Sequence, residues 1–234
     1  MTYWREYWNT SPIVHDENFL RQVGKTVNGA PVGQAVSDTI VRDIVAQLTI
    51  NAQDRVLDLC CGNGLITWQC AQHCLSITGV DFSLPLIRVA AKHFSRKNVE
   101  YVSADVCSLP ESLTVEPFTK VYMYEALQHL STADTQSLLL TLRQSASAGA
   151  PVLFASVPDR DHLWTFYNTP ERREEYHRRV ADGTEAIGHW WTKSELASLG
   201  ESFGYVVQCT TPNPDLHGAH YRFDALFVPD TAQR

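Results

Sequence analysis

The residues best suited to chemistry lie where a short apolar strand meets a glycine turn. The run Arg55–Leu59 is predicted to be a buried strand, and Cys-Cys-Gly-Asn-Gly follows it directly at 60–64. Small residues at such a turn let a ligand approach the backbone, and the N-terminus of the next helix offers free N–H groups. This combination predicts a nucleotide-binding turn.

Two features of the turn narrow the type of nucleotide. The dinucleotide fingerprint G-x-G-x-x-G is broken, because Gly62 and Gly64 are followed by Thr67 at the third position. Asp58 precedes the turn, where a carboxylate would repel a pyrophosphate and attract a cation. S-adenosylmethionine meets this demand, since it has no phosphate and its sulfonium and amino group are positively charged. A nicotinamide-dependent oxidoreductase is the weaker alternative.

The segment Val56–Gly64 resembles motif I of the class I S-adenosylmethionine-dependent methyltransferases. The resemblance implies that Asp81, which ends the next strand, binds the ribose hydroxyls, and that Asp105 lies against the adenine amino group. It also places Tyr124 and Glu125 beside the methionine part, although Glu125 could instead cap a helix at 126–130. The predicted cofactor-binding residues are Asp58, Cys60, Gly62, Gly64, Asp81, Phe82, Ser83, Asp105, Val106, Tyr124 and Glu125. A side chain added at Gly64 is expected to fill space needed by the ligand.

One histidine is placed to act on an acceptor. His129 follows the strand 120–124, where many small-molecule members of the family carry a residue that faces the acceptor. An imidazole could take the proton of a hydroxyl acceptor as the methyl arrives, so His129 is the candidate catalytic base. A packing role on the following helix is the competing interpretation. The strand end lacks the D/N-P-P-Y signature of enzymes that methylate nucleic-acid bases.

Two aromatic-rich segments fall outside the motifs. Residues 1–36 begin with four aromatic side chains at helical spacing, which predicts one aromatic face and a lid. Residues 159–192 carry aromatic, histidine and charged side chains without strand alternation, which predicts a cap insertion over the acceptor site. The charges at 171–179 are expected to pair along a helix surface. Recognition of an anionic acceptor group, such as a phosphate or a carboxylate, by the arginines of this run is the alternative. The predicted acceptor-binding residues are Tyr3, Trp4, Tyr7, Trp8, His162, Trp164, Tyr167, His189 and Trp190.

The elements that must position these residues alternate along the chain. Apolar runs alternate with helical patterns between Ser37, a predicted helix cap, and Val157, which is typical of βαβ units in a parallel sheet. We expect an α/β fold: a doubly wound, mostly parallel, seven-stranded Rossmann-like sheet in a single domain over 1–234. Its expected strands are 55–59, 76–80, 100–103, 120–124, 151–157, 205–209 and 221–228. Its expected helices are 65–74, 84–94, 134–147 and 194–202.

Composition limits the class of protein. The chain has 234 residues, of which 44% are hydrophobic and 19% charged, and a formal charge of −7 argues against a broad nucleic-acid-binding face. No apolar run reaches membrane-span length, so we expect a cytoplasmic protein. The six cysteines form no C-x-x-C pair and are expected to be reduced, with no metal. A small-molecule methyltransferase is thus the leading hypothesis, and a non-catalytic S-adenosylmethionine-binding module is the alternative.

Overall fold

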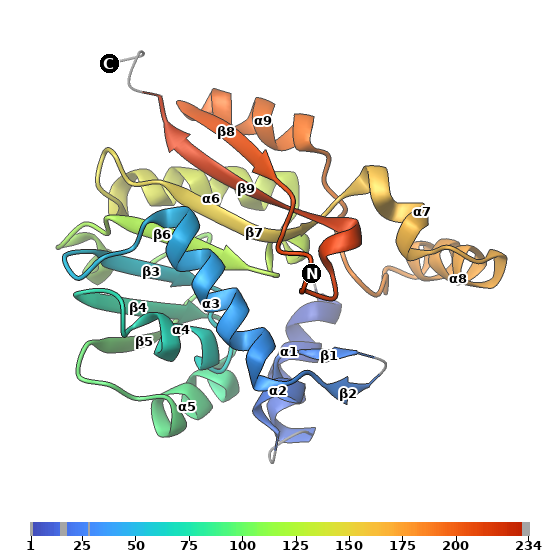
Figure 1. The fold of residues 1–234 in the computed structure, drawn as a ribbon, viewed down its shortest axis with the longest axis horizontal. Helices are drawn as coiled ribbons and strands as arrows, with labels where there is room; N and C mark the ends of the chain where they lie inside the picture. Colours follow the sequence, from blue (N-terminus) through green and yellow to red (C-terminus); the bar gives the residue numbers. More distant parts are fainter. Residues whose placement is uncertain (1, 15–17, 28, 231–234) are drawn as a thin grey trace.

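The computed structural model describes residues 2–14, 18–27 and 29–230, and its centre is a seven-stranded sheet (Figure 1). The strand order is β5-β4-β3-β6-β7-β9-β8. Neighbouring strands from β5 to β7 are parallel, and β9 runs antiparallel to both β7 and β8. The strands are β3 (Arg55–Leu59), β4 (Ser76–Asp81), β5 (Val99–Ser103), β6 (Lys120–Tyr124), β7 (Val152–Pro158), β8 (Tyr205–Thr210) and β9 (Arg222–Pro229). The expected doubly wound α/β fold is confirmed.

Two apolar layers hold helices to the two faces of the sheet. Successive side chains of a strand point to opposite faces, so Tyr122 packs with helices α3 (Gln34–Leu48) and α4 (Leu65–Cys70). Its neighbours Val121 and Met123 pack with α6 (Thr132–Ser145) and α9 (Lys193–Ser202) on the other face. Helix α5 (Leu84–His93) packs along β5 at the sheet edge. Burial on both faces explains why the strands are nearly continuous apolar runs.

Three helix boundaries differ from those expected. Helix α3 begins at Gln34 with Gly33 as its N-cap, so Ser37 lies inside the helix and is buried, because Val36 already packs against the core. Helix α4 ends at Cys70 rather than at 74, since the Asn98 side chain donates to two carbonyls of the following turn. Helix α6 begins at Thr132, with Ser131 as its cap.

The N-terminal segment and the cap lie at the carboxyl ends of the parallel strands (Figure 1). The first comprises α1 (Thr2–Val14), α2 (Phe19–Gln22), β1 (Thr26–Val27) and β2 (Ala30–Pro31). The second comprises η3 (Arg160–His162), α7 (Leu163–Phe166) and α8 (Pro170–Ala181). Three short 3₁₀ turns complete the described elements, η1 (Glu111–Thr114), η2 (Leu127–His129) and η4 (Ala219–Tyr221). Ligands of open α/β sheets bind at this edge.

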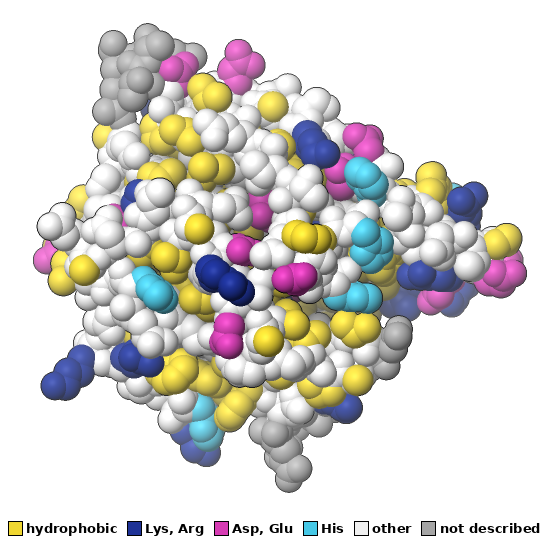
Figure 2. All heavy atoms as spheres, viewed as in Figure 1, with side chains coloured by type: hydrophobic (Ala, Val, Ile, Leu, Met, Phe, Trp, Pro, Cys, Tyr) yellow, Lys and Arg dark blue, Asp and Glu magenta, His cyan; other side chains and the backbone are white. Residues whose placement is uncertain are grey.

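The surface and the thiols add two observations. On the face drawn in Figure 2, Lys and Arg side chains are interspersed with Asp and Glu, most densely over the end that carries α8. All six cysteines are free thiols, as expected from the sequence. Among the residues that the structure describes, no helix combines the length and the apolar character needed to cross a bilayer.

Candidate active site

One large cavity of about 880 Å³ opens at the carboxyl ends of the strands. Its walls come from the ends of β3, β4 and β6, the loop after β5, the N-terminal segment, the cap, and the turn before β9. One half holds carboxylates at successive strand ends, and the other half, the acceptor chamber, lies between α1, the hairpin β1–β2 and the cap. A cavity of this volume accommodates a nucleoside-sized ligand and a second small molecule.

Asp58 of β3 is buried at the base of the carboxylate half. The Thr67 hydroxyl donates to its Oδ2 at 2.6 Å and the Tyr122 hydroxyl donates to the same oxygen at 2.8 Å. Burial raises the pKa of Asp58 to about 7, although both hydroxyl donors act against that shift. A cationic ligand group nearby would restore the carboxylate, so Asp58 is suited to bind positive charge.

Asp81 at the end of β4 ties the glycine turn to the start of α5. Its carboxylate accepts the backbone N–H of Gly62 at 2.9 Å and that of Ser83 at 2.8 Å. Burial raises the pKa of Asp81 to about 6, and the two backbone donors oppose this shift. Each carboxylate oxygen can accept a further bond, so Asp81 can bind ligand hydroxyls while it holds the turn. Ser83 itself caps α5 and does not line the cavity.

The Asp105 carboxylate, which is expected to bind an adenine amino group, interacts with the N-terminal helix α1. Arg5 of α1 forms an ion pair with the Asp105 carboxylate, and its guanidinium lies 4.9 Å from the centre of the Phe82 ring. Phe82, Asp105 and Val106 all line the cavity. Arg5 therefore lies where an adenine ring would stack on Phe82 and bind Asp105.

The glycine turn holds one strained residue, Cys60, and shows one departure from expectation, at Gly64. Cys60 and Gly62 line the cavity with φ of 57° and 58°, in the left-handed region that favours glycine. Gly64 (φ 79°) does not line it; a Cβ there would lie 2.5 Å from the Tyr101 hydroxyl oxygen. The expectation that a side chain at Gly64 would enter ligand space is wrong, because it would collide with Tyr101 instead.

The acceptor chamber has a polar wall at the ends of β6 and β7. Glu125 forms an ion pair with Lys25, which directly precedes β1 of the N-terminal hairpin. The Oε1 atom of Glu125 also accepts a hydrogen bond from the Ser156 hydroxyl at 3.3 Å. Burial raises the pKa of Glu125, but Lys25 and Arg222 overcome it and lower the pKa to about 2. Glu125 caps no helix, since η2 begins without a side-chain cap. Glu125 and Ser156 both have positive φ, 51° and 59°.

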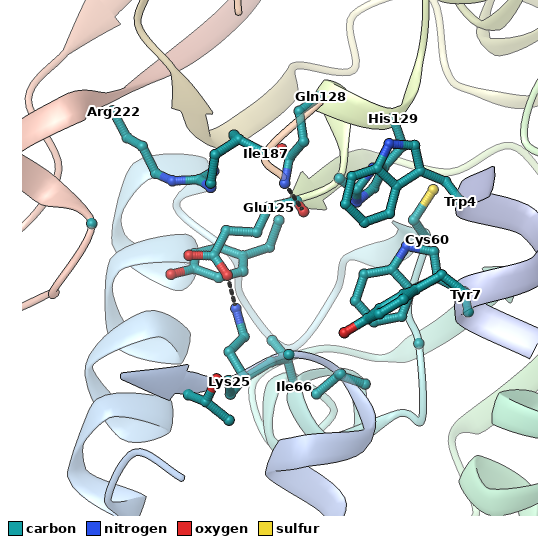
Figure 3. Close-up of a pocket in the computed structure, with 18 of the residues that line it drawn as sticks. Trp4, Tyr7, Lys25, Cys60, Ile66, Glu125, Gln128, His129, Ile187 and Arg222 are labelled. Atoms are coloured by element: carbon teal, nitrogen blue, oxygen red, sulfur yellow. Dashed lines mark hydrogen bonds and ion pairs between the residues drawn. The ribbon is translucent and has the colours of Figure 1, made fainter. Parts of the chain in front are cut away.

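The opposite wall is aromatic and carries His129 (Figure 3). The His129 ring centre lies 4.5 Å from that of Trp4 and 5.7 Å from that of Trp8. Its Nδ1 is buried and has no hydrogen-bond partner. Burial lowers the pKa of His129 to about 3, and the positive charge of Arg222 adds to this effect. The imidazole is therefore neutral and has a free nitrogen at neutral pH.

The predicted acceptor residues divide into two sets. Tyr3, Trp4, Tyr7 and Trp8 all line the cavity from α1. His162, Trp164, Tyr167, His189 and Trp190 do not line it. Tyr167 and Trp190 are buried in a satellite core beneath the cap, and Trp164 packs on the Tyr176 ring. The cap contributes Thr165, Phe166, Asn168, Arg172, Arg179, Ala186 and Ile187 to the lining instead.

The ion pairing expected along the surface of α8 is limited, among the described residues, to Arg179 with Glu175.

Sequence reasoning missed three side chains of the chamber, Lys25, Gln128 and Arg222. A charged residue inside an apolar strand needs a structural reason. This holds for Asp58 in Arg55–Leu59, and it applies equally to Arg222 in the run Arg222–Pro229. The Asn-Gly pair at 28–29 is a hairpin signal that could have drawn attention to Lys25. No sequence signal distinguishes Gln128.

Comparison with known proteins agrees with this geometry. Residues 56–149 match the methyltransferase domain family, and this match includes the glycine turn and the ends of β4, β5 and β6. This part of the chain is a class I S-adenosylmethionine-dependent methyltransferase domain. The chain is therefore an S-adenosylmethionine-dependent methyltransferase rather than a nicotinamide-dependent oxidoreductase.

Three methyltransferases, one similar in sequence and two similar in fold, can be compared with this chain. A ubiquinone biosynthesis O-methyltransferase of Coxiella burnetii is 27% identical over 182 residues, covering 76% of this chain and 71% of that protein. The magnesium protoporphyrin IX methyltransferase of Synechocystis PCC 6803, crystallised with SAH, superposes with a TM-score of 0.65 at 15% identity, over 98% and 99% of the two chains. The N-methyltransferase NodS of Bradyrhizobium japonicum WM9 gives 0.60 at 15% identity, over 84% and 98%.

The residues present fit S-adenosylmethionine as the methyl donor. Asp58 offers a buried carboxylate for a cation, and Asp81 offers free carboxylate lone pairs beside the glycine turn. Phe82 and Asp105 together suit a flat ring that carries a hydrogen-bond donor. The positive φ of Gly62 keeps the turn close to the cavity, and a Cβ there would lie 2.9 Å from Val23. The carboxylate half thus carries the charges and shape that this donor requires.

Proposed function

We propose that this enzyme transfers a methyl group to an oxygen or nitrogen of a small organic acceptor held in the chamber. The observation that carries the proposal is the continuity of one cavity from the strand-end carboxylates to the aromatic and polar walls between α1 and the cap. Two substrates bound in its two halves would be adjacent. A methyltransferase of ubiquinone biosynthesis and a magnesium protoporphyrin IX methyltransferase, to which this chain is similar, are both named for small molecules.

Positioning is the main task of the protein in this reaction. S-adenosylmethionine, when bound, supplies an activated methyl group and leaves as a neutral thioether. Asp58 and Asp81 would hold the donor on the sheet side, while Trp4 and Trp8 of α1 close the chamber on the other side. Aligning two reactants in this way is worth roughly 7–11 kcal/mol. Excluding water from the site strengthens the electrostatic interactions inside it.

His129 is the proposed base for a hydroxyl acceptor. His129 lines the cavity and its Nδ1 is buried without a partner, so an acceptor hydroxyl reaches this nitrogen only when the neighbouring Trp4 and Trp8 side chains shift. The acceptor oxygen then forms the new bond to the methyl carbon as the proton passes to the imidazole. A free amine acceptor would need no such base.

The proposal is tested with isotopically labelled S-adenosylmethionine and a panel of small phenols, hydroxy acids and amines. Formation of SAH and of a labelled product in the presence of one acceptor class is the expected result. Turnover must also fall when Trp4 and Trp8 are both replaced by alanine while donor binding, measured by calorimetry, is kept. Labelling confined to protein or RNA added to the assay would overturn the assignment of a small acceptor.

A further inference from the structure

The acceptor chamber contains a buried cation without an ion-pair partner. Arg222 at the start of β9 is buried, and it forms no ion pair with any carboxylate among the described residues. Its Nη1 donates to the carbonyl of Ser156, its Nε has no partner, and its guanidinium carbon lies 5.1 Å from the centre of the Tyr221 ring. Glu125 stabilises the Arg222 charge electrostatically without a direct ion pair, so Arg222 and Lys25 share one carboxylate. Two buried cations with one counter-charge are costly unless a ligand adds a negative group.

The rest of the polar wall leaves an excess of positive charge. Glu125 is committed to Lys25, whose ammonium also lies 4.1 Å from the centre of the Tyr124 ring. Arg172 and Arg179 of α8 line the outer part of the cavity. Arg172 stacks on Phe166 at 4.7 Å, while Arg179 pairs with Glu175 outside the cavity lining. A protein with a net charge of −7 thus presents a net positive chamber.

The other walls define the shape and polarity of the ligand. Figure 3 shows Trp4, Tyr7 and His129 facing Lys25, Glu125 and Arg222 across the space, with Gln128 and Ile187 between them. The Gln128 Nε2 donates to the Glu125 carbonyl at 2.7 Å, whereas its Oε1 is buried without a partner. The walls therefore suit a flat apolar body that carries an anionic group at one end and a donor along its side.

We propose that the acceptor is a ring-bearing carboxylic acid whose carboxylate is bound by Arg222 and Lys25 and is not itself methylated. This inference rests on the proposed function and names its substrate class. The carboxylate would pair with two cations that share the single counter-charge of Glu125, and the reacting hydroxyl or amine would lie toward His129 and the donor half. Charge neutralisation at Arg222 would also remove one of the effects that weaken His129 as a base.

The test compares 3,4-dihydroxybenzoate with 3,4-dihydroxybenzamide, which differ in charge but hardly in shape. Binding is followed by tryptophan fluorescence in the presence of SAH, and methyl transfer is followed separately with the methyl donor. The acid should bind about 10- to 150-fold more tightly than the amide, as expected for hydrogen bonds to a charged group. Equal binding of the two, or no saturable binding of either, would overturn the inference.

Variants separate a recognition role from a structural one. Arg222→Met and Lys25→Met should weaken binding of the acid but not of the amide, and Arg222→Lys should restore part of the loss. Glu125→Gln, which removes the competing carboxylate, should tighten binding of the acid, a gain that a merely structural residue would not produce. Arg178→Met, on an exposed part of α8 outside the cavity lining, is the matched control. Unchanged acid binding in Arg222→Met with normal donor affinity would contradict the proposal.

Product analysis distinguishes this inference from the proposed function. An ether or N-methyl product supports a carboxylate used for binding, whereas an alkali-labile methyl ester overturns that part while leaving small-molecule methyl transfer intact. Efficient turnover of neutral phenols or amines with no preference for acids would likewise overturn the inference alone. Absence of methyl transfer to any small acceptor would instead contradict the proposed function.

Discussion

Asp58 couples donor binding to pH at the scale of a single residue. Its pKa of about 7 makes the empty site half protonated at neutral pH, whereas a cationic donor requires the carboxylate. Below pH 7 binding must expel a proton, so the affinity for S-adenosylmethionine should fall by up to about tenfold per pH unit. Calorimetry between pH 6.0 and 7.5 measures this slope while the donor amino group stays largely protonated.

An Asp58→Asn variant provides the control for this slope. It should bind the donor more weakly and with little dependence on pH between about 6.5 and 7.5, because the group that titrates near neutrality is gone. Asp81, whose pKa is about 6, would add to the slope only toward the acidic end. An unchanged slope in the variant would assign the pH dependence to another group.

His129 provides a second prediction at the residue scale. His129→Ala should lower the rate with a hydroxyl acceptor by about 10²–10⁴-fold, because the proton acceptor is lost. Donor affinity should change little, since the ring contacts Trp4 and Trp8 rather than the strand-end carboxylates. Single-turnover rates with the donor saturating check this. Full activity with an amine acceptor in the same variant would identify a reaction that needs no base.

Helix α1 acts at the scale of an element, because it covers both halves of the cavity. Its Arg5 occupies Asp105, and the Trp8 carbonyl accepts a bond from the Ser83 hydroxyl at 2.9 Å. An ion pair between such half-exposed side chains is worth at most about 1 kcal/mol. Arg5→Ala should therefore tighten donor binding by up to about fivefold, as calorimetry can measure.

The matched control for α1 is Arg21→Ala on α2, an exposed arginine outside the cavity lining. It should leave donor affinity unchanged. Weaker binding in Arg5→Ala would mean that Arg5 holds the donor rather than competing with it. Because α1 packs against α5 as well as over the cavity, single substitutions are cleaner tests than removal of the helix.

The two cap segments also differ in how their aromatic residues are used. Those of α1 line the cavity, while Tyr167 and Trp190 of the cap join Leu163 and Tyr221 in a satellite core. The backbone N–H of His189 donates to the Gln128 carbonyl at 2.7 Å and so ties the cap to η2. The cap thus supports the wall that carries Gln128 and His129.

At the scale of the whole molecule, donor binding should stabilise the fold. A ligand at one hundred times its Kd that binds only the folded state adds about 2.7 kcal/mol to the free energy of unfolding. For a chain of this length that corresponds to a rise of about 5–11 °C in Tm. Differential scanning fluorimetry with S-adenosylmethionine measures the shift, and NAD at the same concentration should give none.

The sequence by itself determined the sheet and the positions of the strand-end carboxylates. Apolar runs such as Arg55–Leu59 and Lys120–Tyr124 are short, continuous and bounded by turns, so their type and limits follow from local pattern. Because parallel strands end at the same edge, the order of Asp58, Asp81 and Asp105 along the chain already implied a shared site. Local information sufficed for these features.

The tertiary structure alone decided which side chains meet across long stretches of chain. Lys25 and Glu125 are a hundred positions apart, as are Arg5 and Asp105, and Arg222 joins them only because β9 inserts between β7 and β8. The high density of aromatic residues identified the cap in the sequence. It could not distinguish the aromatic residues that form the core of the cap from those that line the cavity. Burial and unpaired charge are properties of the packed chain, and no periodicity encodes them.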